Sequence, residues 1–142
     1  MFAKIIIGFF TVFSLLGFQP QRTTVDDLQI VKPKTAEQHI QEIFGTKAKI
    51  ATAVLTHESG LKLDAKGYNC MYNGKSKACK KEDRPKAWSV DCGISQVNVK
   101  GKICPPELLT LEGNMEAVEK IYKEQGLNAW VSYKNGKYKK HL

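Results

Sequence analysis

The spacing of apolar residues along the chain predicts an amphipathic helix over residues 46–60. Apolar side chains recur there every three or four residues, and Glu58 lies on the same helical face. Gly60 is a typical helix terminator, so Glu58 is expected in the last turn of this helix. A carboxyl group on an apolar face, near the negative end of a helix dipole, is favoured in its protonated form. This environment suits a general acid, although an ordinary amphipathic helix that ends in solvent is the simpler interpretation.

Two further helices follow from the same kind of pattern. Residues 35–38 (Thr-Ala-Glu-Gln) have the form of a capping box, and the apolar residues after them end at Gly45. Residues 112–125 carry an apolar stripe at helical spacing and end before Gly126. Both stripes are typical of packing surfaces, so we expect these helices to form a core.

Residues 89–99 alternate between apolar and polar side chains, which predicts an extended segment. One side carries Val90, Cys92 and Ile94, and the other carries Asp91, Gly93 and Ser95. Gly93 would let another backbone or a ring-shaped ligand approach closely. The amides of Gln96 and Asn98 are suited to hydrogen bonds with sugar hydroxyl or N-acetyl groups. An edge strand with one solvated face is the alternative interpretation.

The first 20 residues differ in composition from the rest of the 142-residue chain. Lys4 precedes an apolar run over residues 5–18, which is shorter than the ~20 residues of a membrane-spanning helix and typical of a secretory signal. No clear cleavage site follows, so an uncleaved membrane anchor through residues 5–18 is an alternative. We divide the remainder into a polar linker, 21–34, and one globular domain, 35–142. The expected location is secreted, periplasmic or elsewhere in the cell envelope.

The four cysteines, Cys70, Cys79, Cys92 and Cys104, all fall in the predicted domain. An even number of cysteines in an exported chain indicates two disulfides, with three possible connectivities. We favour the local pairs Cys70–Cys79 and Cys92–Cys104, because each would hold one loop beside the expected cleft. A four-cysteine zinc site is disfavoured, because the spacing is wide and no C-x-x-C pair is present. We expect no metal and no cofactor.

The net charge of +8 arises largely from a basic stretch at residues 61–88 and from lysines after residue 133. A basic exported protein is attracted to anionic polymers of the cell envelope, although the charge could serve solubility alone. Nucleic acid is not an expected partner, because no recognised binding motif interleaves the basic residues.

The order of several short motifs resembles the lysozyme-like superfamily, and specifically the transglycosylase SLT (soluble lytic transglycosylase) domain. Glu58-Ser59-Gly60 resembles the triplet that carries the family's catalytic glutamate, and 93–98 (G-I-S-Q-V-N) resembles its G-L-M-Q-like segment. Asn114 in N-M-E-A-V and the aromatic segment 129–136 (A-W-V-S-Y-K-N-G) match the later features in order. The resemblance covers about residues 46–138.

The resemblance implies a mainly α (α+β) lysozyme-like fold, in which a small β/loop segment flanks a substrate cleft. It implies cleavage of the β-1,4 bond between N-acetylmuramic acid and N-acetylglucosamine in peptidoglycan, with Glu58 as general acid and base and a 1,6-anhydro product. We expect a monomer that binds glycan strands. The substrate-binding candidates are Ser59, Gly93, Ser95, Gln96, Asn98 and Tyr133, and Tyr133 is expected near the carboxyl group of Glu58.

The sequence also departs from that family. Ser95 replaces a usual methionine. The insert between Glu58 and Gly93 is basic and contains cysteines, so the family's substrate contacts are not carried over to it. The stretch 91–98 (D-C-G-I-S-Q-V-N) is similar to the D-Y-G-I-x-Q-I-N strand of animal c-type lysozymes, which makes Asp91 a candidate second carboxylate. An Asp91 facing Glu58 across the cleft predicts hydrolysis, whereas an Asp91 turned aside or hydrogen-bonded predicts an anhydro product. A non-catalytic cationic peptidoglycan-binding domain and a cystine-stabilised interaction protein of a secretion apparatus are the alternatives from other classes.

Overall fold

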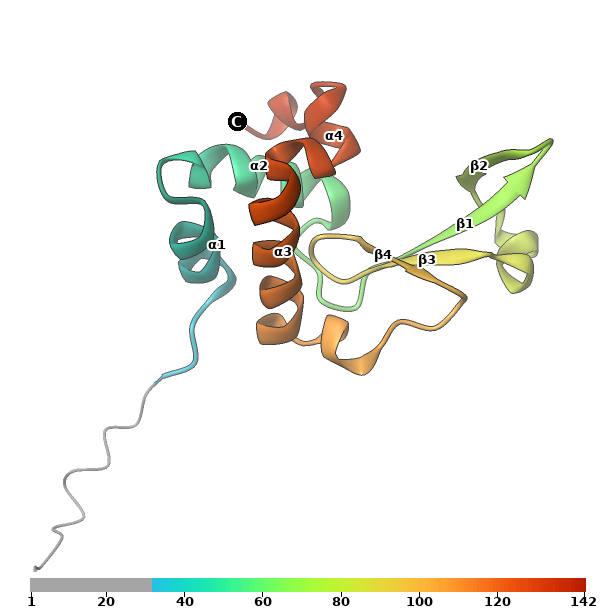
Figure 1. Cartoon of the computed structure of the whole chain (residues 1–142), viewed down its shortest axis with the longest axis horizontal. Coiled ribbons are helices and arrows are strands. Elements are labelled where there is room, and N and C mark those ends of the chain that lie inside the picture. The colour runs from blue at the N-terminus through green and yellow to red at the C-terminus, as the bar shows by residue number, and fades with distance from the viewer. Residues whose placement is uncertain (1–31) are drawn as a thin grey trace, which may run out of the picture. The chain divides into compact units, whose positions relative to one another are not determined.

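The computed structural model describes residues 32–142, in which helices gather on one side and a four-stranded sheet extends on the other (Figure 1). Residues 33–142 form one compact unit. The expected signal or anchor at 1–20 and most of the linker at 21–34 lie outside the described residues. Within residues 32–142, every helix is too short or too polar to cross a bilayer.

The first helix begins and ends where the sequence predicts, and the second ends at its predicted terminator. Helix α1 (Ala36–Phe44) starts at Thr35, whose side chain accepts a hydrogen bond from the Gln38 backbone while the Gln38 side chain accepts one from the Thr35 backbone. This reciprocal pair confirms the capping box. Helix α2 (Ala48–Ser59) ends at Gly60, which has the left-handed φ of 67° that favours glycine. It starts two residues later than predicted, because Gly45–Lys47 forms a 3-10 turn.

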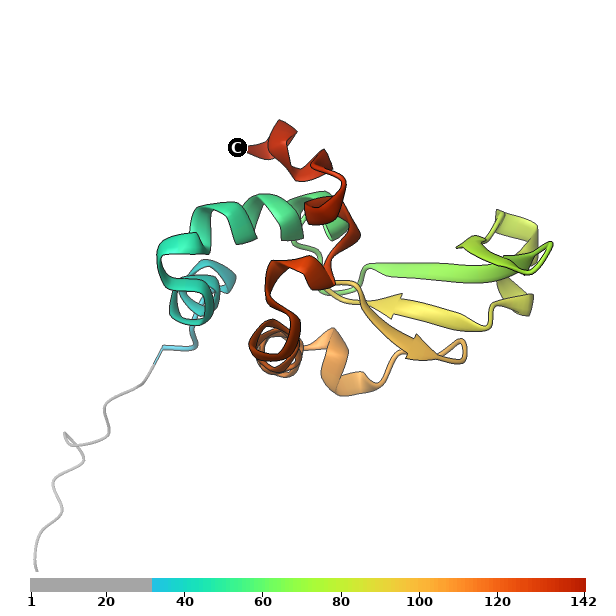
Figure 2. The ribbon, with the colours of Figure 1, turned by 45° about the horizontal axis from the view of Figure 1, so that its top comes forward.

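Two later helices and the 3-10 turns that follow the first of them pack with α1 and α2 (Figure 2). Helix α3 (Leu111–Gln125) is capped by the side chain of Thr110 and ends before Gly126, as predicted. The short helix α4 (Val131–Lys134) lies between the 3-10 turns Gly126–Ala129 and Lys137–His141. The buried core of this part is made by Ile40, Phe44, Val54, Leu55, Ile94, Met115, Val118, Leu127 and Trp130.

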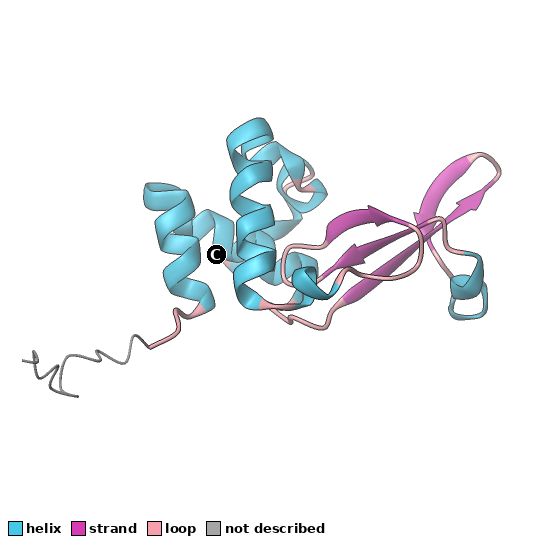
Figure 3. Ribbon diagram, turned by 60° about the horizontal axis from the view of Figure 1, so that its bottom comes forward, coloured by secondary structure: helices cyan, strands magenta, loops and turns pink. Residues whose placement is uncertain are grey.

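The sheet consists of β1 (Lys66–Tyr72), β2 (Lys75–Ala78), β3 (Ser89–Cys92) and β4 (Val97–Lys100), in the antiparallel order β2-β1-β3-β4 (Figure 3). The 3-10 turn Lys81–Lys86 lies between β2 and β3 in sequence, and the 3-10 turn Pro106–Leu109 follows β4. Asn73 and Gly74 connect β1 to β2 with φ values of 51° and 74°, the left-handed pair that a tight hairpin turn requires. The fold is therefore mixed α+β, as predicted.

The two faces of the sheet differ in chemistry. Cross-strand pairing places Asp91 opposite both Gly67 and Asn98, so these residues share one face. Val90 and Cys92 point to the other face, where they form a second buried cluster with Cys104 and Leu108. The predicted division of residues 90–92 into a core side and an open side is confirmed.

The prediction of a continuous extended segment over residues 89–99 is wrong beyond Cys92. The chain turns between β3 and β4, with φ values of 69° at Gly93 and 53° at Gln96. Two left-handed residues reverse the chain direction, and β4 returns beside β3. Strict alternation ends at this turn, and Ile94 packs in the helical core.

The four cysteines form two disulfides, Cys70–Cys79 and Cys92–Cys104. This is the favoured local pairing, and it leaves no thiolate for a four-cysteine zinc site. The first disulfide joins the edge hairpin to the residue after β2, and the second joins β3 to the segment before Pro106–Leu109. Such bonds indicate that the protein folds in an oxidising compartment.

Candidate functional site

The carboxyl group of Glu58 is held by a residue from a distant part of the chain. Glu58 lies in the last turn of α2 and is half-buried. Its Oε1 accepts hydrogen bonds from the backbone N–H of Ser132 (3.2 Å) and from the Ser132 hydroxyl group. Ser132, in α4, is only 3% exposed, so its position is set by packing. Because both bonds go to Oε1, Oε2 is the oxygen left free to exchange a proton with a ligand.

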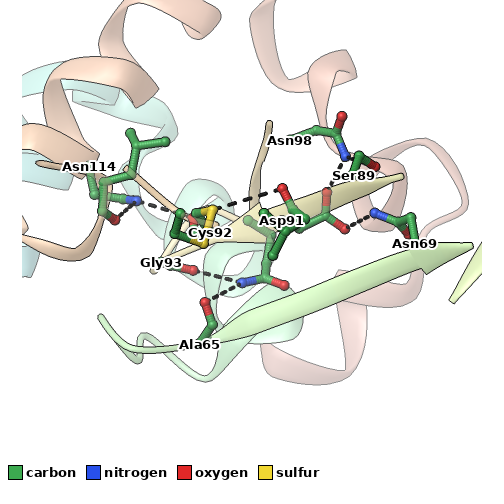
Figure 4. The surroundings of a disulfide bond; sticks show 12 residues. Ala65, Asn69, Ser89, Asp91, Cys92, Gly93, Asn98 and Asn114 are labelled. Carbon is green, nitrogen blue, oxygen red and sulfur yellow. Dashed lines mark hydrogen bonds between the residues drawn. A yellow bond between two sulfur atoms is a disulfide. The ribbon is translucent and has the colours of Figure 1, made fainter. Parts of the chain in front are cut away.

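A second carboxylate, Asp91, is fixed by two side-chain amides. Asn69 Nδ2 donates to Asp91 Oδ2 (2.8 Å), and Asn98 Nδ2 donates to Asp91 Oδ1 (2.6 Å). Figure 4 shows Asp91 between these two amides, which come from β1 and β4 on either side of β3. Asn98 is itself oriented by Ser89, whose hydroxyl oxygen lies 3.0 Å from its Nδ2. These donors orient the carboxylate and complement its negative charge.

Glu58 and Asp91 line the same hollow, which has a volume of about 430 Å³. Its lining comes from the end of α2, from the sheet and its connections, and from residues 129–131. It combines carboxylates, amides, a hydroxyl group and apolar side chains: Glu58, Asn69, Ser76, Trp88, Asp91, Gln96, Asn98, Ala129, Trp130 and Val131. A partly apolar concave surface with a few fixed polar groups is typical of a small-molecule or glycan site.

Three of the predicted substrate-binding residues are engaged in holding this hollow together. Ser59 donates its hydroxyl hydrogen to the carbonyl oxygen of Ile94 (2.6 Å) and ties the end of α2 to the β3–β4 turn. Ser95 is buried, and its hydroxyl group donates to Asn114 Oδ1 (2.9 Å). A side chain at Gly93 would lie 2.2 Å from Asn114 Nδ2, so the close approach at this glycine is made by the protein and not by a ligand. Each therefore has a structural contact that explains the residue without a substrate.

Gln96 and Asn98 lie on the hollow, as the sequence predicts. Gln96 Nε2 donates to the Gly93 carbonyl oxygen (2.9 Å), which leaves its carbonyl oxygen available to a ligand. Tyr133 is not the partner of Glu58. It stacks on Tyr138 with ring centroids 5.3 Å apart and packs against the helical core.

Sequence reasoning missed Ser132, which is adjacent to Tyr133, and it assigned no role to Asn69 or Trp88. The contact between Ser132 and Glu58 spans 74 residues, and no local pattern encodes it. The dipeptide Asn73-Gly74 was a usable signal, because it predicts a hairpin. That hairpin would have placed Asn69 on a strand.

Among residues 32–142, four side chains have shifted pKa values, and all four lie outside the hollow: Glu37, Tyr72, Asp83 and His141. The Tyr72 hydroxyl group donates to Asp83 Oδ2 (2.7 Å) and holds the pKa of Asp83 below its ordinary value of 3.8. Partial burial, and then the charge of Lys140, lowers the pKa of His141 below 6.5. His141 lies against His57, with 3.3 Å between Nε2 and Nδ1. His57 therefore faces the C-terminal turn and not Glu58.

Comparison with family models, with curated proteins and with solved structures finds no match to this chain. The resemblance to the lysozyme-like superfamily therefore depends on the motifs of the chain itself. The site described above stands independently of it, since its contacts come from the structure.

Proposed function

We propose that this protein is an exported glycosidase that cleaves the β-1,4 bond between N-acetylmuramic acid and N-acetylglucosamine in peptidoglycan. The observation that carries the proposal is the placement of Glu58 and Asp91 on one hollow in contrasting environments. Glu58 lies at a helix end with one free oxygen, whereas Asp91 is bound by amides at both oxygens. Two carboxyl groups with different surroundings are the usual requirement for glycoside cleavage.

In the proposed reaction, Glu58 Oε2 donates a proton to the glycosidic oxygen as the bond to the anomeric carbon breaks. Ser132 keeps the carboxyl group oriented toward the hollow throughout. Asp91 faces the positive charge that develops on the sugar ring, and its amide partners hold it in place. Glu58, now ionised, then takes a proton from the group that attacks the anomeric carbon.

The attacking group decides the product. An Asp91 carboxylate that lines the hollow with Glu58 supports attack by water, which gives a hydrolytic, lysozyme-type product. The motif resemblance instead supports a lytic transglycosylase, in which the 6-hydroxyl group of the sugar attacks and forms a 1,6-anhydro ring. Both amides bind the oxygens of Asp91, and this agrees with an Asp91 that stabilises charge without forming a covalent bond. Because both oxygens of Asp91 are already hydrogen-bonded, its contacts support the 1,6-anhydro product over the hydrolytic one.

The test is mass spectrometry of fragments released from purified peptidoglycan by the wild type, Glu58→Gln and Asp91→Asn. Asp64→Asn is a matched control, because Asp64 is exposed and outside the hollow. We expect release to stop with Glu58→Gln and to continue with Asp64→Asn. Reducing-end products that also disappear with Asp91→Asn establish the hydrolytic reaction, and anhydro products that survive Asp91→Asn establish the lytic one.

Failure of the wild type to release fragments from several wall types would refute the enzymatic proposal. Binding of the wall without release would leave a cationic peptidoglycan-binding domain. The basic residues of the insert at 61–88, many of them exposed, would support additional binding to anionic envelope polymers, which high salt should remove. Size-exclusion chromatography tests the expected monomer.

A further inference from the structure

An exposed tryptophan lies on the wall of the hollow, away from Glu58 along the sheet. Trp88 is 41% exposed, whereas the only other tryptophan of the chain, Trp130, is 6% exposed. Both line the hollow that contains Glu58 and Asp91. Aromatic side chains on the wall of a concave site with a few fixed polar groups are typical of ligand-binding surfaces.

Trp88 is held rigidly despite its exposure. Its indole N–H donates to Ser76 Oγ (3.2 Å). Its backbone N–H donates to the carbonyl oxygen of Asn69 (3.0 Å), and its own carbonyl oxygen accepts from the N–H of Gly101 (2.8 Å). The residue is therefore fixed between β1 and the end of β4. A ring fixed in this way loses little conformational freedom when a ligand covers it.

The surface next to Trp88 continues the cleft face of the sheet. Met71 lies two residues after Asn69 on β1 and thus points to the same face, and it pairs across the hairpin with Ser76. Met71 is 54% exposed. The face is consequently polar around Asp91 and apolar further out, around Met71 and Trp88.

Trp88 is too far along the strand to touch the sugar that reacts. It precedes Asp91 by three residues of nearly extended chain, a distance of about 10 Å. This length exceeds one pyranose ring, so a glycan whose reacting bond lies between Glu58 and Asp91 would reach Trp88 with a neighbouring sugar.

We propose that Trp88 is a stacking platform for an N-acetylhexosamine ring of the bound glycan strand, at least one sugar away from the cleaved bond. The C–H face of a pyranose is apolar and slightly positive, which complements the negative face of an indole ring. The amides of Asn69 and Asn98, which hold Asp91, line the same hollow as Trp88, and the backbone N–H of Trp88 donates to the carbonyl oxygen of Asn69. Trp88 thereby selects long glycan strands over short fragments. The inference depends on the proposed function, because it takes a glycan as the occupant of the hollow.

The binding test uses Glu58→Gln, so that no turnover occurs, and titrates it with a hexasaccharide of N-acetylglucosamine. Because Trp130 is buried, we expect the sugar to shift the tryptophan emission to the blue and to reduce quenching by acrylamide. Trp88→Ala in the same background should remove both effects and weaken binding, measured by calorimetry, about tenfold, which corresponds to about 1.4 kcal/mol. Trp88→Phe should retain part of the affinity. Ile103→Ala, which removes an 82% exposed apolar side chain outside the hollow, should bind like its parent.

The kinetic test uses peptide-free glycan strands with Glu58 intact. Trp88→Ala should raise KM and leave kcat nearly unchanged, and its preference for long strands over the hexasaccharide should fall. Affinity and KM of Trp88→Ala and Trp88→Phe equal to those of Ile103→Ala would overturn the platform. Failure of the hexasaccharide to bind at all, or protection of Trp88 by free stem peptides and not by the sugar, would overturn it as well. Sugar binding that depends on Trp88, together with fragment release that survives Glu58→Gln, would support the platform while refuting the proposed catalytic role of Glu58.

Discussion

Replacing the buried Asn114 with leucine should destabilise the domain severely. Asn114 is completely buried and makes four side-chain hydrogen bonds. Its Nδ2 donates to the carbonyl oxygens of Leu108 (2.8 Å) and Cys92 (3.2 Å), and its Oδ1 accepts from Ser95 through the backbone N–H (3.1 Å) and the hydroxyl group (2.9 Å). An amide has two N–H donors and two acceptor lone pairs, so its full capacity is used. Figure 4 shows this side chain directed toward Gly93 and Cys92.

The magnitude follows from these four bonds. Each contributes about 1 kcal/mol net, so Asn114→Leu should lower the free energy of unfolding by about 4 kcal/mol. Buried partner groups left unpaired increase the loss, since leucine can satisfy none of them. The total stability of a domain is about 5–15 kcal/mol, so this single side chain accounts for a large part of it.

Asn114→Asp removes the two N–H donors of the side chain and keeps its hydrogen-bond acceptors. The introduced carboxylate can still accept from Ser95, but it places a negative oxygen against the carbonyl oxygens of Leu108 and Cys92. Burial and these carbonyls favour its protonated form in the folded state, so its pKa is raised above the unfolded value of about 4. Stability is then retained below about pH 4 and lost as the pH rises through the folded-state pKa.

Urea unfolding followed by far-ultraviolet circular dichroism, with the disulfides intact, measures both effects. Asn128→Leu is the control, because Asn128 is exposed, and it should change stability by less than about 0.5 kcal/mol. The reasoning is refuted if the free energy of unfolding of Asn114→Leu is within about 1 kcal/mol of the wild-type value. It is also refuted if the free energy of unfolding of Asn114→Asp, relative to that of the wild type, does not rise between neutral pH and about pH 4.

Three other predictions concern pH and the disulfides. The pKa of Asp83 is lowered in the folded state, so its ionised form stabilises the fold above its unfolded pKa of about 3.8, and this stability is lost as the pH falls. Tyr72→Phe should flatten the acidic part of the curve of unfolding free energy against pH, measured with urea. An unchanged curve would contradict the assignment. The lowered pKa of His141 means that stability is present above about pH 6.5 and falls as the pH drops; His141→Gln should reduce this slope, measured by thermal unfolding at pH 7 and 5. Removing the Cys92–Cys104 disulfide with two alanines should cost about 3 kcal/mol or more in urea unfolding. Removing the other disulfide should cost less, because it lies outside the second buried cluster; equal losses would contradict this.

Helices α1, α2 and α3 were predictable because each has a local signal at one or both ends, whereas the short helix α4 was not predicted. The capping box at Thr35 and the glycines after α1, α2 and α3 act over a few residues, and the structure places helix boundaries within two residues of those signals. Asp91 was assigned to the open face for a similar reason, since alternation along β3 needs no distant partner. The position of Glu58 in the last turn of α2 followed from Gly60.

The site contacts could not be predicted because they join distant segments. Ser132 belongs to α4, which follows α3, and it contacts Glu58 across 74 residues of sequence. The sequence contains no local pattern that pairs the two residues. Asn69 reaches Asp91 through the register of β1 on β3, which periodicity alone cannot set. The reversal at Gly93 was missed because Ile94 and Ser95 continue the alternation of β3 by coincidence while the backbone has already turned.

The long sequence separation between Glu58 and Ser132 also sets an order of assembly for a chain that crosses a membrane from its N-terminus. Both disulfides join residues only 9 and 12 positions apart, so the sheet can close covalently as soon as Cys104 has emerged. At that stage Asp91 can already be bound by its amides, while Glu58 still lacks its partner. The carboxyl group becomes oriented only when Ser132 is present, so in a chain exported as proposed the activity would begin only after this segment has emerged.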